Sequence, residues 1–313
     1  MLKKNNKKKG VKELKKILIA AMIILMQVSV TAAEISANEK LVQMEIETYG
    51  GEQTGAILGR INRLEKDYSG TNMQGNMNVR INSLYEIMYG NAGAPSLIAK
   101  INAIEWNAYH EVTAESIIKR LDKLENEILG KTTSENIIKR INELAQGTFG
   151  REQIPLIEMQ VPNEVLIRAE LAEDIGSRSL QAGDIVNIKV AENVIIDGKL
   201  IIAKGQVGKG TVTSVRKAKG WMGRNGKINI DFQVLNSIDG NEIEIYVGEE
   251  SKSEMRVREM IGGAAMVGMN INDDWNKLLV HGKNIELAAG TALYVQTKKA
   301  TNVYALQLEN DFK

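Results

Sequence analysis

Apolar and polar positions follow a pattern that repeats every 20 residues from about residue 40 to residue 150. A basic residue opens each repeat and an aliphatic follows it, as in Arg60-Ile61. A second aliphatic stands three residues later, often next to an acid, as in Leu124-Glu125. Apolar positions at i, i+4 and i+7 form the stripe of an amphipathic α-helix. The pattern predicts one helix of about 13 residues per repeat, about 20 Å long.

Residues typical of helix caps flank these predicted helices. The expected N-caps are Ser96, Ser116 and Ser134, and the glycines expected just past the helix ends are Gly70, Gly90, Gly130 and Gly150. We expect five full helices, preceded by a partial one near residues 40–48. A single helix of this length is marginal in water, so neighbouring repeats must stabilise one another by packing.

The recurrent Arg and Glu of one repeat, such as Arg60 and Glu65, stand five residues apart. This spacing is not the best one for an ion pair within a helix. It leaves two interpretations, a salt bridge between adjacent repeats or a solvated charged face. Asn after the first aliphatic, as at Asn102, is unusual inside a helix, and we expect it to bond the loop of the next repeat.

The repeat, an aromatic-Gly pair followed by a spacer and (R/K)-(I/L)-x-x-(L/I)-E, resembles repeats in uncharacterised exported proteins of bacteria with complex envelopes. The resemblance covers about a third of the chain. This sequence departs from the pattern at His110, where Gly is expected, at Tyr85 and Ala145, where Glu is expected, and at Pro95 in one loop. The resemblance implies export and a helical array, but it implies no particular chemistry.

From about residue 154, strand-like alternation replaces the helical spacing. Alternating runs predict strands at 165–171, 185–190, 227–234 and 242–247. Asp197-Gly198 predicts a type I′ hairpin, and Asp239-Gly240 predicts a second turn. Glycines that follow the phrase apolar-x-x are expected to set turns between strands, namely Gly183, Gly205 and Gly290.

We therefore expect an α+β multidomain chain, in which a helical array over residues 34–150 precedes an antiparallel β-barrel or β-sandwich over residues 151–313. The second segment should hold about eight to ten strands. Its turn phrases resemble those of β-domains in bacterial envelope proteins, and they are similar to the barrel-forming component of type IV secretion cores. That resemblance implies a partner-binding or scaffold role.

Residues 1–33 have the features of a secretory signal peptide, because eight lysines precede an apolar run at 17–26 and Thr31-Ala32-Ala33 follows. The alternative is a retained membrane anchor, although the apolar run is shorter than the roughly 20 residues that span a bilayer. The chain has no Cys, which excludes disulfides and thiolate metal sites. Removing the leader from a chain of net charge +1 leaves about −6, which does not favour nucleic acid.

Few residues suggest catalysis or metal binding. The two histidines, His110 and His281, lie in different segments. The glycines of 205–211 match no phosphate-binding motif and are expected to form turns or bulges. Oxygen ligands for Ca²⁺ occur at 270–274 but fit no EF-hand. The small-residue run at 260–269 is expected to form a short buried helix or a tight connection. We expect no catalytic residue, no metal and no cofactor.

One loop between two predicted strands combines basic residues with an aromatic, which suits an anionic glycan, a lipid headgroup or an acidic partner. The alternative is a polar hairpin tip with Trp221 folded back on the barrel. The candidate partner-binding residues are Arg216, Lys217, Lys219, Trp221, Met222, Arg224 and Lys227.

The favoured interpretation is a non-enzymatic protein of the cell envelope that is exported to the periplasm, the envelope or the medium. Its helical repeats would act as a spacer or a self-association module that forms homo-oligomers. Its β-domain would bind a wall, membrane or protein partner. One alternative is a membrane-anchored scaffold component of an envelope-spanning secretion system. A second alternative is an envelope glycan hydrolase that uses carboxylates.

Overall fold

The computed structural model describes residues 35–90, 93–219, 226–262 and 284–308. The chain divides into two compact units, residues 1–39 and residues 40–313. The predicted leader at residues 1–33 lies outside the described residues. The second unit holds the helical repeats and the β-domain.

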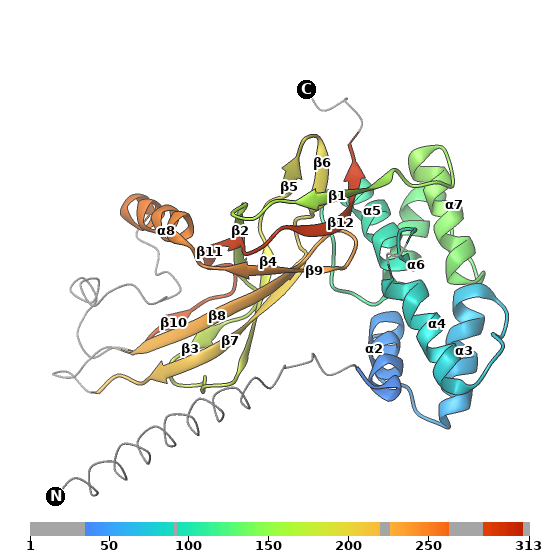
Figure 1. Ribbon diagram of the computed structural model, residues 1–313, viewed down its shortest axis with the longest axis horizontal. Helices are drawn as coiled ribbons and strands as arrows, with labels where there is room; N and C mark the ends of the chain where they lie inside the picture. Colours follow the sequence, from blue (N-terminus) through green and yellow to red (C-terminus); the bar gives the residue numbers. More distant parts are fainter. Residues whose placement is uncertain (1–34, 91–92, 220–225, 263–283, 309–313) are drawn as a thin grey trace, which may run out of the picture. The chain divides into compact units, whose positions relative to one another are not determined.

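Each repeat forms one helix of 13 residues, so the predicted period and helix length are confirmed (Figure 1). The helices are α2 (Ala37–Tyr49), α3 (Ile57–Ser69), α4 (Met77–Tyr89), α5 (Leu97–Tyr109), α6 (Ile117–Leu129) and α7 (Ile137–Phe149). The expectation of a partial first helix is wrong, because α2 is full length. Ser36 and Glu39 each accept a hydrogen bond from the other's backbone N–H, a capping box that starts the helix early.

The predicted caps are confirmed in part. Ser96 caps α5 by accepting from the N–H of Ala99, and Gly70, Gly130 and Gly150 are left-handed. Ser116 occupies the N-cap position of α6 without a side-chain cap bond, and Ser134 is not a cap, because Asn136 caps α7. Gly90 is extended, with φ −71°. His110, which replaces a glycine, adopts the left-handed conformation with φ 56°.

The core of the array is built from the two aliphatic positions of each repeat, which are buried in all six helices. The first position is Leu41, Ile61, Ile81, Ile101, Leu121 and Ile141, and the second is Met44, Leu64, Leu84, Ile104, Leu124 and Leu144. The stripe that the sequence shows is therefore the surface on which neighbouring repeats pack.

Salt bridges do connect adjacent repeats, which confirms one of the two interpretations and fixes its register. The pairs join a glutamate to the arginine fifteen residues later, Glu45–Arg60, Glu65–Arg80, Glu105–Arg120 and Glu125–Arg140. We call these four pairs the ladder. In three of them the arginine Nε and Nη2 each donate to a different carboxylate oxygen, at 2.5–2.8 Å. Such fork geometry is the strong form of a charge-assisted hydrogen bond.

Further hydrogen bonds satisfy the buried ladder carboxylates. For Glu45, Glu105 and Glu125 the loop residue eight positions later donates its backbone N–H, as Thr133 does to Glu125 at 3.1 Å. The expectation that Asn bonds the next loop is wrong, because Asn62 and Asn102 instead accept from the ladder arginine of the next helix. The glutamate side chains of the ladder are at most 1% exposed, so each charge depends on its partner.

Six antiparallel strands close into a barrel in the order β11-β2-β4-β7-β8-β9, so the barrel alternative is confirmed (Figure 1). Its strands are β2 (Leu166–Leu171), β4 (Ile185–Val190), β7 (Val207–Arg216), β8 (Lys227–Asn236), β9 (Glu242–Tyr246) and β11 (Ala292–Thr297). Alternate residues face the core, as Val186, Ile188 and Val190 do along β4.

A second sheet has the order β1-β12-β6-β5, and two short strands pair separately. The remaining elements are β1 (Leu156–Val161), β3 (Ile175–Gly176), β5 (Val194–Ile196), β6 (Lys199–Ile202), α8 (Glu249–Gly262), β10 (Glu286–Leu287) and β12 (Thr301–Gln307). Twelve strands thus occur in the described residues, more than the eight to ten expected. The small-residue run at 260–269 begins in the last turn of α8, and from residue 263 it lies outside the described residues.

The predicted turns are confirmed. Asp197 and Gly198 both have positive φ, 50° and 71°, as a type I′ hairpin between β5 and β6 requires. The three glycines expected between strands, Gly183, Gly205 and Gly290, also have positive φ.

We predict that Glu125→Gln lowers the free energy of unfolding at pH 7 by about 3–5 kcal/mol, because it leaves a buried arginine without its counter-charge. Burial raises the pKa of Glu125, but the hydrogen bonds from Arg140 and Thr133 outweigh it and leave that pKa lowered. The stabilisation is therefore full above the ordinary glutamate pKa and is lost as pH falls through the lowered value. The difference in free energy of unfolding between wild type and variant should therefore be smaller at pH 3 than at pH 7, and urea unfolding at the two pH values would measure it.

The matched control for this variant is Glu127→Gln, an exposed position on the same helix. It should change the free energy of unfolding by less than about 0.5 kcal/mol. Equal losses in the two variants would contradict a stabilising ladder.

Candidate functional site: the junction and the cleft beside α5

The N-terminal half of α5 contacts the loop at 237–241 between β8 and β9. Ser96 Oγ donates to the carbonyl of Asp239 at 3.3 Å, and Asn102 Nδ2 donates to the carbonyl of Ile238 at 2.9 Å. Gly240 approaches so closely that a Cβ there would lie 2.8 Å from Ile98 Cγ2. Asp239-Gly240, which the sequence identifies only as a turn, therefore also docks the β-domain on the array.

Buried hydrogen bonds hold this loop in shape. The carboxylate of Asp239 accepts from Ser237 Oγ, from the backbone N–H and side-chain amide of Asn241, and from the N–H of Tyr304 at 2.7 Å. Burial raises the pKa of Asp239, although these hydrogen bonds favour its ionised form. A fully satisfied buried carboxylate gives the loop one shape, and α5 is bound to that shape.

The C-terminal end of α5 is bound as well. Trp106 Nε1 donates to Asn193 Oδ1 at 3.0 Å, and the N–H of Val112 donates to the carbonyl of Lys204 at 2.8 Å. A Cβ on Gly205 would lie 2.1 Å from the carbonyl oxygen of Val112, so only glycine fits there. We call these contacts, together with those at the 237–241 loop, the junction.

A cavity of about 140 Å³ with both polar and apolar walls lies within the junction. Its walls include Glu47 of α2, Tyr89 of α4, Arg120 of α6 and Gln206 before β7. Burial raises the pKa of Glu47, and the charge of Arg120 opposes that shift. The helical array thus presents charged and polar groups to the β-domain.

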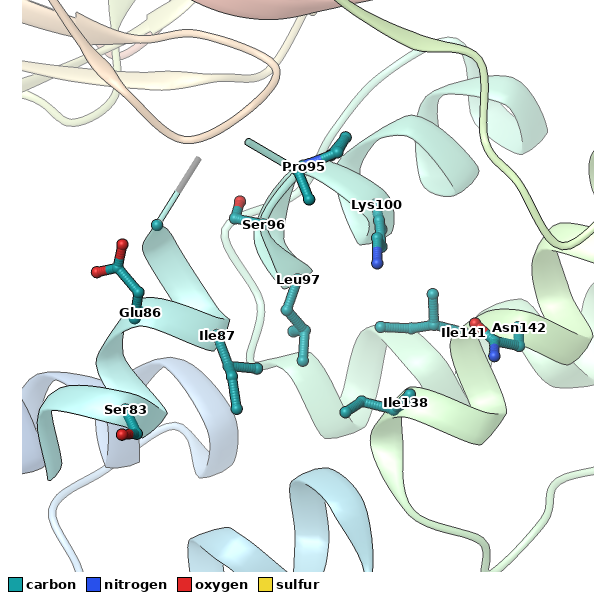
Figure 2. A pocket seen from close by; sticks show the side chains of 12 residues that line it. Ser83, Glu86, Ile87, Pro95, Ser96, Leu97, Lys100, Ile138, Ile141 and Asn142 are labelled. Carbon is teal, nitrogen blue, oxygen red and sulfur yellow. The ribbon is translucent and has the colours of Figure 1, made fainter. Parts of the chain in front are cut away.

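A larger cleft of about 480 Å³ opens where the ladder is interrupted. Tyr85 and Lys100 stand where a ladder glutamate and arginine would pair, and the cleft lies among α4, α5 and α7. Figure 2 shows Ile87, Leu97 and Ile141 turned toward the opening, with the Lys100 side chain reaching into it. The lining also includes the carboxylate of Glu86 and the polar side chains of Ser83, Ser96 and Asn142, so the cleft combines apolar walls with groups of both charges and does not select one class of ligand.

The predicted basic loop is described only at its two stems. Arg216 ends β7 and pairs in register with Lys227, which begins β8. Lys217 and Lys219 are exposed beyond β7. Trp221, Met222 and Arg224 lie outside the described residues, so the combination of basic groups with an exposed aromatic stays a prediction.

The described residues contain no group of three or more His, Asp or Glu that could hold a metal ion. His110 caps α5 and lies edge-on to the Trp106 ring at 5.1 Å, which is a structural position. His281 and the oxygen-rich run at 270–274 lie outside the described residues. The glycines of 205–211 occupy a turn and the start of β7, as expected.

Among the helices that the structure describes, none is long and apolar enough to cross a bilayer. The apolar run at residues 17–26 is not among them.

No family model matches the chain, and no curated protein matches it. Among solved structures it is similar to ComB10 of the Com Type IV secretion system of Helicobacter pylori. That match covers 46% of this chain and 90% of ComB10, with 15% identity and a TM-score of 0.25. A TM-score of this size is too low to establish a shared fold.

We predict that Asn102→Ala destabilises the protein by about 1–3 kcal/mol, because it removes two buried hydrogen bonds at once. Its side chain joins Arg120 of the ladder at 2.6 Å to Ile238 of the β-domain. Thermal unfolding followed by calorimetry would measure the loss.

Asn142→Ala is the control, because Asn142 occupies the same position in α7, after which no further repeat helix follows. It should change the free energy of unfolding much less. Equal effects of the two substitutions would contradict a special role for the junction, because alanine has the higher helix propensity and the substitution by itself should not destabilise a helix.

Proposed function

We propose that the protein is an exported, non-enzymatic structural component of the cell envelope. Its helical array serves as a spacer and self-association module, and its β-domain binds a wall, membrane or protein partner. The observation that carries this proposal is the junction, which joins the array and the barrel through buried, satisfied polar groups. An array and a barrel joined in this way can hold two binding partners in fixed positions relative to each other.

The placement of the charged residues supports a structural role. The most deeply buried charged side chains of the array belong to the ladder, where each has an opposite charge as its partner. A catalytic acid or base needs a proton-accessible site and a pKa suited to its task. The ladder groups instead form closed pairs, and this arrangement suits rigidity.

A second candidate is a membrane-anchored scaffold of an envelope-spanning secretion system. The sequence feature that favours it is the apolar run at 17–26 behind a basic start, which would anchor the chain if it is retained. ComB10 belongs to a secretion system of this class, but a similarity with so low a TM-score adds no weight to the candidate.

The two candidates predict different mature N-termini, which cell fractionation with terminal-peptide mass spectrometry can identify. The exported form should begin at Glu34, after cleavage behind Ala33, and should occur in the envelope or the medium. A scaffold should occur in the membrane fraction with residues 17–33 retained. An intact chain in the cytosol would contradict both candidates.

The basic loop gives a second test of the β-domain. We predict that Trp221→Ala with Arg224→Ala weakens binding of the purified protein to isolated cell envelopes at least tenfold. Lys299→Ala serves as the charge-matched control, because it removes one surface cation elsewhere in the β-domain. Unchanged binding of the loop variant in a pelleting assay would exclude the loop as the binding site.

A further inference from the structure

The helices of the array meet end to end as well as side by side. Gly50, just past the end of α2, lies against the N-cap of α6, since a Cβ on it would lie 3.6 Å from Ser116 Cβ. Gly70, just past α3, lies in the same way against the N-cap of α7, since a Cβ on it would lie 3.1 Å from Asn136 Nδ2. The C-terminal end of one helix thus covers the N-terminal end of the helix four repeats later.

Burial of the first helical residue follows this contact. Ile117 and Ile137 begin α6 and α7, and both are at most 1% exposed. Leu97 begins α5 and is 4% exposed, in the helix whose N-terminus meets the loop at 237–241. The equivalent residues of α3 and α4, Ile57 and Met77, are 44% and 48% exposed.

Two further apolar side chains widen the uncovered surface at the start of α3 and α4. Leu58 and Val79 are 48% and 49% exposed, although Ile138, the counterpart of Leu58 in the covered helix α7, is also 37% exposed. With Ile57 and Met77 they form what we call the leading end of the array. Four large apolar side chains exposed within two adjacent first turns are more than the scattered exposure normal for a soluble surface.

The opposite end of the array lacks the corresponding cover. The next-to-last residue of a repeat helix is fully buried in α2 and α3, whose ends meet α6 and α7, at Thr48 and Tyr68, but half-buried in α6 and α7, at Ile128 and Thr148. Around Gly130 and Gly150 the space is open. A hollow of about 630 Å³ lies between the end of α6 and the flank of α7, and beside Leu129 its walls are mostly polar, including Lys131, Glu143 and Glu152. We call the ends of α6 and α7 with this hollow the trailing end.

We propose that the leading end of one copy docks on the trailing end of a second copy, repeating between chains the end-to-end contact made within the chain. This rests on the proposed role of the array as a self-association module. The contact brings positive helix N-termini to negative helix C-termini, so the helix dipoles are complementary. A head-to-tail contact between two different surfaces leaves one of each free, so it can extend into longer assemblies.

Sedimentation velocity of the purified full chain tests this proposal. The weight-average mass of the wild type should rise with concentration between about 1 and 100 μM, which is the range of a modest interface. Leu58→Glu with Val79→Glu should stay monomeric, because carboxylates on the leading end oppose apolar docking. Acidic residues in a first helical turn are compatible with folding, which circular dichroism would confirm. Ile185→Glu, at an exposed apolar site on β4, is the control and should associate as the wild type does.

Mixing two defective variants distinguishes a head-to-tail contact from a symmetric one. The second variant, Lys131→Glu with Gln146→Glu, places carboxylates across the hollow of the trailing end. Each variant alone should be monomeric, whereas their mixture should form dimers that do not extend, because each supplies one intact surface.

A wild type that is monomeric throughout this range would overturn the proposal, and so would a leading-end variant that associates normally or a mixture that stays monomeric. A monomeric wild type would also remove the self-association role of the array. Cellular location and envelope binding by the β-domain are measured separately by fractionation and by the pelleting assay, so failure of those parts of the proposed function is distinguishable.

Discussion

The array depends on the pairing of a buried glutamate with the arginine of the next repeat. Removing two charges from water costs several kcal/mol per ion, so such a pair persists only where geometry and extra hydrogen bonds compensate. Glu125 receives two bonds from Arg140 and two from Thr133, which meets that condition. Because a slip of one residue would bury the carboxylate without its partner, the ladder also fixes the register between helices. The aliphatic stripe alone, whose residues are similar in size, would fix it less strictly.

The interruption of the ladder coincides with the attachment of the β-domain. Between α4 and α5 the pair is replaced by Tyr85 and Lys100, and α5 is the helix bound at both ends by the junction. Asn102 connects the two systems, because it accepts from Arg120 of the ladder and donates to Ile238 of the β-domain. The repeat pattern is therefore relaxed where the helix has to serve a second partner, and the cleft that Lys100 lines lies beside that helix.

The repeat helices and the long barrel strands follow from the sequence, because their apolar spacing is regular and the contacts that stabilise them recur. The register of the ladder could also have been predicted from the sequence, because a glutamate stands in the ninth helical position only where an arginine follows fifteen residues later. Ala145 fits this rule, because position 160 is Gln. Short strands such as β3 could not be predicted from the sequence, because two residues are too few to show a hydrophobic period. The docking role of Asp239 could not be predicted, because it depends on which helix reaches that turn in three dimensions.

The ladder also limits how one copy can contact another. At its start, Lys40 has no glutamate fifteen residues before it and instead bonds Asn82 at 2.9 Å. At its end, the fully buried Ala145 offers no carboxylate to a further arginine. A second chain therefore cannot extend the ladder, so a contact between the two ends of the array has to use other groups, apolar at the leading end and largely polar at the trailing end. Because it lacks the buried, paired charges of the ladder, that contact should be weaker than the packing within one array. Assembly would then respond to local concentration, while each array keeps its own fold.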